Sequence, residues 1–243
     1  LLHSAGGRMF DPSKQYEVVF DSPNTVEALE YVKSLLPYMP KSAVSASFLE
    51  VVDSIVTGKA AMAFYWGRPY GRAWDENKEV FKNLEAYNHA RHPKTGNRSN
   101  WNDFQGWCIP KANNPYIKEV KAALAYYQTS KVWPVRYCQS LVPNVSPVYK
   151  DTAADPELQK HPFFETKKRT IDTYYTGSLK YSSSTANELL GGVNPLAGIV
   201  HGRSILAQTV QKVVIDNMKP ADAAKWGAKE LESVRKEHFS LVI

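Results

Sequence analysis

The stretch that decides the predicted fold is Thr57-Gly-Lys-Ala-Ala-Met-Ala-Phe-Tyr-Trp-Gly67. It follows an amphipathic segment, and its apolar run predicts a buried strand over Lys59 to Trp66. Two large aromatic residues end that strand just before a loop. Rings in that position can stack on a ligand, because a ring buries much area with little side-chain entropy to lose. No nucleophile with its base lies nearby in the sequence, so the stretch favours a binding protein over an enzyme.

The composition of the 243-residue chain indicates a soluble, globular protein, with 43% hydrophobic and 22% charged residues. No apolar run approaches the roughly 20 residues that span a bilayer. The chain begins with Leu1 and shows no signal-peptide pattern, so we expect a processed or truncated product. The formal net charge is +6, but the cations are dispersed. Without a recognised nucleic-acid module, that charge predicts a solvated surface and no nucleic-acid partner.

The two cysteines, Cys108 and Cys138, are too few for a disulfide framework and wrongly spaced for zinc. Cys108 lies in a strand-like run, and Cys138 follows the next predicted helix. A disulfide between them and two separately buried thiols are therefore both open.

Local signals place most of the secondary structure. Ser22-Pro23, Asn114-Pro115 and Asp155-Pro156 each combine an N-cap residue with proline at the first helical position. Apolar spacing predicts helices over 23–36, 48–56, 116–130, 196–217 and 220–237, and short strands over 84–87 and 106–109. This order predicts an α/β chain with a helical C-terminal third.

Five short motifs then occur in one order along the chain. They are Gly6-Gly-Arg-Met-Phe-Asp11, Val26-Glu-Ala-Leu-Glu-Tyr31, Gly58-Lys-Ala-Ala-Met-Ala63, Gly106-Trp-Cys-Ile-Pro-Lys111 and Lys219-Pro-Ala-Asp-Ala-Ala224. The set resembles the second half of the extracellular solute-binding proteins of ABC importers, family 1, which includes maltose-binding protein. The resemblance covers essentially the whole chain.

The resemblance implies an α/β, periplasmic-binding-protein-like type II fold, with two lobes joined by a hinge and most of the N-terminal lobe absent. Residues 1–87 would be the first part of the C-terminal lobe. Residues 88–131 would be an excursion into the N-terminal lobe, and residues 132–243 the helical part of the C-terminal lobe.

The resemblance also implies a function and partners. A solute, which we expect to be a carbohydrate, would bind non-covalently in the inter-lobe cleft for delivery to an ABC transporter permease. The protein would be periplasmic or extracellular, with or without a lipid anchor. Its partners would be the solute, the permease and the missing N-terminal part of the same protein, and no cofactor is expected.

Eight residues are the candidate ligand contacts. Around the predicted strand end they are Tyr65, Trp66, Arg68 and Tyr70; before the next strand they are Asp103, Gln105 and Trp107; and near the start of the long helix there is Arg203. The rings would cover a sugar's C–H face, and Arg68 would donate to hydroxyls or to an acidic sugar. The alternatives are core aromatics at 64–66, a turn around 103–105 and a surface side chain at Arg203.

Catalytic and metal chemistry find little support in the sequence. His89 and His92 lie in a predicted loop without a further ligand run, and neither G-x-S-x-G nor a P-loop is present. We therefore expect neither catalytic nor metal-binding residues. An extracellular carbohydrate-active enzyme, or a fragment of one, remains the alternative function. A module that binds another macromolecule and no small ligand is a third.

Overall fold

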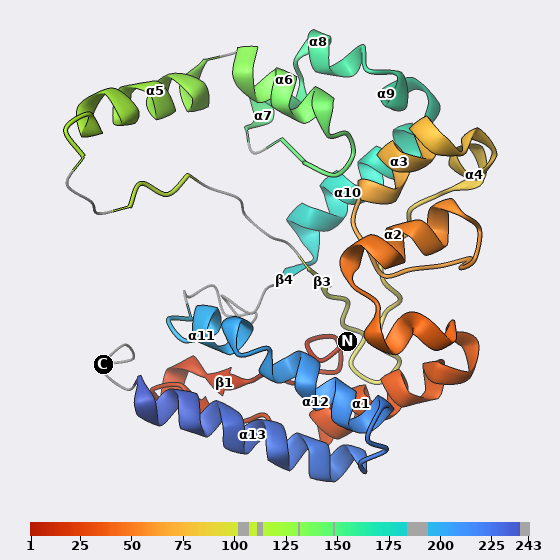
Figure 1. Cartoon of the computed structure of the whole chain (residues 1–243), viewed down its shortest axis with the longest axis vertical. Helices are drawn as coiled ribbons and strands as arrows, with labels where there is room; N and C mark the ends of the chain where they lie inside the picture. Colours follow the sequence, from red (N-terminus) through yellow and green to blue (C-terminus); the bar gives the residue numbers. More distant parts are fainter. Residues whose placement is uncertain (102–106, 111–113, 131, 148, 184–193, 239–243) are drawn as a thin grey trace. The chain divides into compact units, whose positions relative to one another are not determined.

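The computed structural model describes residues 1–101, 107–110, 114–130, 132–147, 149–183 and 194–238. Most of these residues are helical, and each strand is two residues long (Figure 1). The strands form two separate two-stranded sheets. The predicted α/β, type II periplasmic-binding-protein-like fold is therefore wrong: within the described residues no layered sheet exists to carry it.

The chain forms two compact units. Unit 1 comprises Leu1–Ala46, His89–Asn102 and Lys180–Ile243. Unit 2 comprises Ser47–Asn88 and Asp103–Leu179. The lobe boundaries implied by the family resemblance stay a prediction.

Unit 1 combines helices with both small sheets. Its helices are α1 (Pro23–Leu35), α11 (Ala197–Gly202), α12 (Ile205–Val214) and α13 (Pro220–Glu237), with 3-10 turns η1 (Pro12–Lys14), η2 (Leu36–Tyr38) and η3 (Lys41–Ser45). Strand β1 (Phe10–Asp11) pairs antiparallel with β2 (Glu17–Val18), and β3 (Asn100–Trp101) pairs parallel with β4 (Ser182–Ser183).

The core of unit 1 consists of two clusters, one between α1, α12 and α13 and one that joins β1 and α11 to α12 and α13 (Figure 1). Its buried apolar side chains are Met9, Phe10, Phe20, Leu29, Leu196, Val200, Ile205, Val213, Ala223, Ala224, Leu231 and Val234. Gly227 permits close packing in α13, because an added Cβ would lie 2.7 Å from both Phe20 and Thr209.

Unit 2 contains only helices and irregular segments among its described residues. The helices are α2 (Phe48–Val56), α3 (Arg68–Glu76), α4 (Lys78–Asn83), α5 (Ile117–Thr129), α6 (Val132–Ser140), α7 (Lys150–Ala153), α8 (Pro156–Gln159), α9 (Pro162–Thr166) and α10 (Lys168–Lys180).

Aromatic rings fill one end of the unit 2 core. Trp74 meets Phe81 and Phe163 edge-on, at centroid distances of 4.9 and 5.2 Å. Aromatic pairs of this geometry add to the free energy gained by burial alone. They join α3, α4 and α9 into one body with α2 and α10.

Of the three predicted helix starts, Ser22-Pro23 and Asp155-Pro156 are confirmed, whereas Asn114-Pro115 is wrong, because α5 begins at Ile117 with Tyr116 as its N-cap. Ser22 accepts a hydrogen bond from Thr25 N and begins α1, and a capping box between Ser47 and Glu50 begins α2. Gly58 follows α2 with a φ of +73°, the left-handed conformation that commonly ends a helix. The last predicted helix, residues 220–237, matches α13.

The predicted strands in unit 2 are wrong. Residues 59–66 have neither helix nor strand, and Met62 is 89% exposed. Residues 84–87 and the described part of 106–109 are likewise irregular. A strand needs a partner for its backbone groups. None of the described residues supplies one here, so an apolar composition alone did not make a strand.

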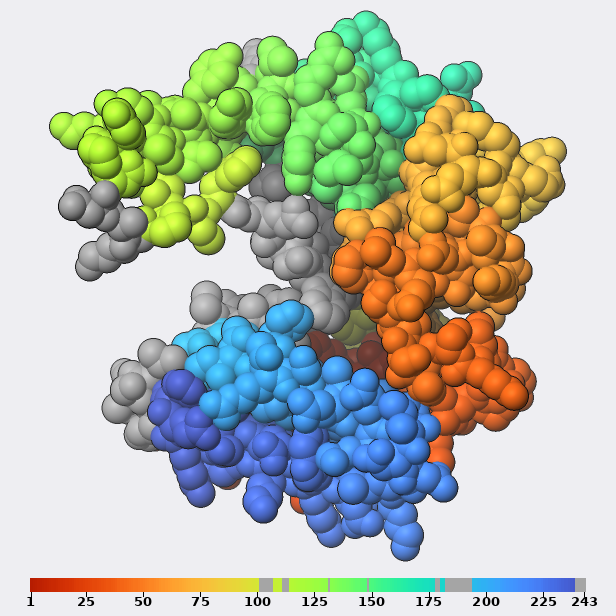
Figure 2. All heavy atoms as spheres, viewed as in Figure 1, coloured from red at the N-terminus to blue at the C-terminus, as the bar shows by residue number. Residues whose placement is uncertain are grey.

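Two further helix predictions need correction. The long helix predicted over 196–217 is two helices, because Ser204 takes a left-handed φ of 53° between α11 and α12. Helix α5 forms as predicted, but none of its residues is buried. The apolar face of α5, which is formed by Ile117, Val120, Leu124 and Tyr127, is only partly covered. Figure 2 shows the yellow-green α5 extending from α6.

The structure shows the state of the two cysteines and whether any helix could cross a membrane. Both thiols are free, Cys108 exposed and Cys138 buried, so the structure contains neither the disulfide nor two buried thiols. In the described part of the chain, no helix has the length and apolar character required to cross a membrane.

Candidate functional site

The ring of Trp66 is the centre of the candidate site. It stacks on the ring of Tyr65 with a centroid distance of 5.1 Å and an interplanar angle of 24°. Tyr65 packs against the unit 2 core, whereas Trp66 is 46% exposed. The partly buried tyrosine therefore holds the tryptophan in place and leaves ring surface available to a ligand.

The main chain beside Trp66 is fixed by close packing at Gly67. A Cβ at this position would lie 2.5 Å from both Asn144 N and Pro143 C. Both of these are backbone atoms, so neither can move aside as a flexible side chain would. Gly67 consequently brings the Pro143–Asn144 backbone against the residue that follows Trp66.

Two buried polar atoms near this contact have no hydrogen-bond partner among the described residues. They are the hydroxyl of Tyr65 and Oδ1 of Asn144. Burial raises the pKa of Tyr65, and the nearby Arg68 charge opposes that shift in part. An unpaired buried polar atom costs free energy. Both atoms are shielded from solvent, so a ligand would reach them only after the side chains that cover them had moved. Sequence reasoning missed Asn144, since nothing local relates it to Trp66.

Arg68 begins α3 and lies on the surface, with its guanidinium 5.4 Å from the centroid of the Phe48 ring. This cation–π contact orients the side chain without an ion pair. Arg68 thus keeps hydrogen-bond donors for an acceptor outside the protein. Together we call Tyr65, Trp66, Arg68 and Asn144 the Trp66 surface.

Tyr70 lies in the core. It is 3% exposed and meets Tyr174 edge-on at a centroid distance of 6.2 Å. Burial raises its pKa, and its side chain is hydrogen-bonded to Thr170. Tyr70 therefore anchors α3 to the unit 2 core, and its hydroxyl already has a hydrogen-bond partner.

The remaining candidates do not join the Trp66 surface in any contact that the structure records. Trp107 belongs to unit 2 and is 57% exposed, while Asp103 and Gln105 lie outside the described residues. Arg203 belongs to unit 1, and its guanidinium lies 2.6 Å from Oε2 of Glu237.

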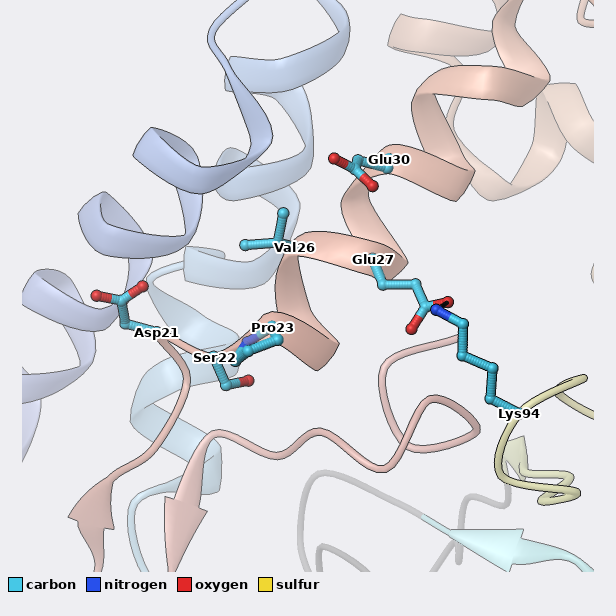
Figure 3. Close-up of a pocket in the computed structure, with 7 residues that line it drawn as sticks. All are labelled: Asp21, Ser22, Pro23, Val26, Glu27, Glu30 and Lys94. Atoms are coloured by element: carbon cyan, nitrogen blue, oxygen red, sulfur yellow. Dashed lines mark ion pairs between the residues drawn. The ribbon is translucent and has the colours of Figure 1, made fainter.

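A separate hollow lies beside α1 in unit 1 (Figure 3). The residues that line it are Asp21, Ser22, Pro23, Val26, Glu27, Glu30 and Lys94. Lys94 Nζ lies 2.7 Å from Glu27, and this hydrogen bond lowers the pKa of the Glu27 carboxyl. The hollow offers charged groups but no aromatic face, so it suits a sugar less well than the Trp66 surface.

Histidine and carboxylate groups form no metal cluster in the part of the chain that the structure describes. His92 Nε2 lies 3.6 Å from Glu27, and its Nδ1 accepts a hydrogen bond from Thr95 N. Burial lowers the pKa of His89. Local contacts and burial therefore account for the environments of His89 and His92.

Comparisons of the chain with protein-family models, curated proteins and solved structures found no match.

Proposed function

We propose that the protein binds a carbohydrate non-covalently at the Trp66 surface. The observation that carries the proposal is the stacked Tyr65–Trp66 pair, with one ring anchored and the other half-exposed. A pre-oriented ring loses little entropy on binding. It can cover the C–H face of a sugar ring over a large contact area.

The polar groups beside the ring match the hydroxyls of a sugar. The Tyr65 hydroxyl can donate or accept, and Asn144 Oδ1 can accept. Both are buried without partners among the described residues, so a sugar would engage them by displacing the side chains that cover them. Arg68 adds donors that suit hydroxyl oxygens or the carboxylate of an acidic sugar. An apolar face flanked by a few polar groups is the usual composition of a small-ligand site.

Delivery of the bound sugar to an ABC importer is a further part of this proposal. Its support is the ordered set of sequence motifs, from Gly6 to Ala224, that resembles solute-binding proteins. The fold class expected from that resemblance is wrong, so the transport role needs a test separate from sugar binding. Binding of the chain to a purified importer permease, with and without the sugar, provides it.

Calorimetric titration against mono- and oligosaccharides, including acidic ones, tests the binding proposal. We expect saturable binding of one sugar class and at least a tenfold loss of affinity in Trp66→Ala, equal to about 1.4 kcal/mol. Trp226→Ala, in helix α13 of unit 1, is the matched control and should retain the affinity. No binding across the panel would refute the proposal.

Two additional readouts separate the alternatives. Mass spectrometry of the recovered sugar distinguishes binding from catalysis, because an altered sugar would favour the carbohydrate-active enzyme. Trp107→Ala tests whether the second predicted ring contributes, with a loss of affinity as the expected result. Unchanged affinity in Trp107→Ala would restrict the site to the Trp66 surface.

A further inference from the structure

The segment before Trp66 has unpaired backbone groups. Ala60 N donates to Ser54 O at 2.9 Å, but Ala61, Met62 and Ala63 make no backbone hydrogen bond with any described residue. Three successive residues in a compact unit normally satisfy these groups within secondary structure or with water. Here water, or a partner, must do so.

The side chains of this segment are unusual for a surface loop. Ala60–Ala63 carries no charge, and Met62 is 89% exposed. Exposed apolar side chains beside unpaired N–H and C=O groups resemble the edge of a sheet, which readily accepts another strand. The segment also lacks proline, so each residue retains its N–H donor.

Two cations bracket the uncharged segment. Lys59 directly precedes it, and Arg68 lies five residues after Ala63, at the start of α3. Neither forms an ion pair with a described residue, and Arg68 lies over the Phe48 ring. If two copies paired as antiparallel strands with Ala63 opposite Ala63, Lys59 of one copy would lie diagonally beside Arg68 of the other. Like charges in that position repel, and flanking charges of this kind discourage self-association.

We propose that Ala60–Ala63 accepts a β-strand from another polypeptide, apolar and uncharged at its centre and carrying a carboxylate at each end. Main-chain hydrogen bonds to Ala61–Ala63 supply most of the affinity, as in other cases of strand addition. The carboxylates face Lys59 and Arg68 and set the register. The free segment has no regular structure, so the strand orders it on binding.

The experiment uses synthetic peptides with the whole chain. The probe is a fluorescent peptide of alternating valine and threonine with an aspartate or glutamate at each end. Its controls are the same peptide N-methylated at alternate residues, which cannot pair as a strand, and a version with lysine at each end. Fluorescence anisotropy reports binding, and hydrogen exchange reports which backbone amides become protected.

We expect the carboxylate-flanked peptide to bind and to protect Ala61, Met62 and Ala63 from exchange. The N-methylated peptide should not bind, and the lysine-flanked peptide should bind about tenfold more weakly. Lys59→Glu should reduce the preference for the carboxylate-flanked peptide. Trp66→Ala should retain peptide binding, which separates this proposal from that of a sugar site.

Three results would overturn the proposal. The first is no binding of the carboxylate-flanked peptide, and the second is equal binding of its N-methylated form. The third is concentration-dependent dimerisation of the free chain with protection of the same amides, which would make a second copy the occupant.

Discussion

The ammonium of Lys167 lies 2.8 Å from the carbonyl oxygen of Leu84, although Lys167 is 4% exposed. It also donates to Lys82 O at 2.9 Å and lies 3.3 Å from Oε1 of Glu85. The positive charge therefore satisfies carbonyls at the end of α4, where a helix favours a cation. This one side chain ties the end of α4 to the start of α10.

Replacing this lysine should destabilise unit 2 strongly. Lys167→Met keeps the apolar part of the side chain but removes the ammonium from two carbonyls and from Oε1 of Glu85, whose Oε2 still accepts from Thr170. We expect a loss of about 3 kcal/mol in the free energy of unfolding, measured by urea denaturation. Lys168→Met is the matched control, because that exposed neighbour should change stability by less than about 0.5 kcal/mol. Equal effects of the two variants would contradict the role of the buried ammonium.

Gly67 should not tolerate a side chain. In Gly67→Ala the new Cβ would be forced against the Pro143–Asn144 backbone, so we expect about 2 kcal/mol of destabilisation and a changed tryptophan fluorescence. Gly71→Ala, within α3, meets nothing within 4 Å and should instead stabilise the protein by about 0.5–1 kcal/mol. Thermal unfolding of both variants measures the difference in sign. A stabilised Gly67→Ala would show that the two segments are not packed together.

His161 should make stability dependent on pH. Its Nδ1 accepts a hydrogen bond from Phe163 N at the start of α9, and burial lowers the pKa of the imidazole. The unfolded chain therefore takes up the proton first as the pH falls below about 6.5. Stability should be complete above that pH and should decline as the pH falls toward the folded pKa.

Substitutions at His161 separate the cap from the titration. His161→Asn can still cap α9 but cannot titrate, so the decline in urea midpoint between about pH 7 and 5 should become shallower. His161→Ala should lose about 1 kcal/mol at neutral pH through the missing cap. An unchanged pH profile in His161→Asn would assign the pH dependence to other groups.

The two thiols should differ in reactivity. Cys108 is exposed, whereas burial raises the pKa of Cys138 to about 11. Only about one thiol in a thousand would then be ionised at Cys138 near pH 8, and the thiolate is the reactive form. A brief treatment with iodoacetamide should modify Cys108 first, as peptide mass spectrometry can measure. Denaturation should equalise the rates, and equal rates in the native protein would contradict the burial.

Local signals predicted the positions of α1, α2, α5 and α13, but they did not predict α3, α4 or the break between α11 and α12. They also failed to predict the strands and the site. Ser22, Asp155 and Pro220 mark helix starts because their effects act within one turn. The run from Lys59 to Trp66 has a strand composition, yet its structure depends on partners elsewhere in the chain. The composition of this segment therefore favours a strand, but it does not determine that a strand forms.

The candidate site shows the same limit. Sequence identified Tyr65, Trp66 and Arg68 as neighbours at the end of one segment. It did not reveal that Tyr70 is buried or that Asn144 packs beside Gly67. Both facts depend on how α3 and the segment after α6 pack, which no local pattern encodes.

The alternation of the chain between its two units has a consequence for synthesis on the ribosome. Unit 2 ends at Leu179, whereas unit 1 needs Leu1–Ala46 together with Lys180–Ile243. Residues 1–46 leave the exit tunnel before residues 180–243, so the core of unit 1 can close only after the later segment has emerged. During that interval Met9, Phe10 and Phe20 are accessible to chaperones. Unit 1 begins first in the sequence, but unit 2 can complete its fold first.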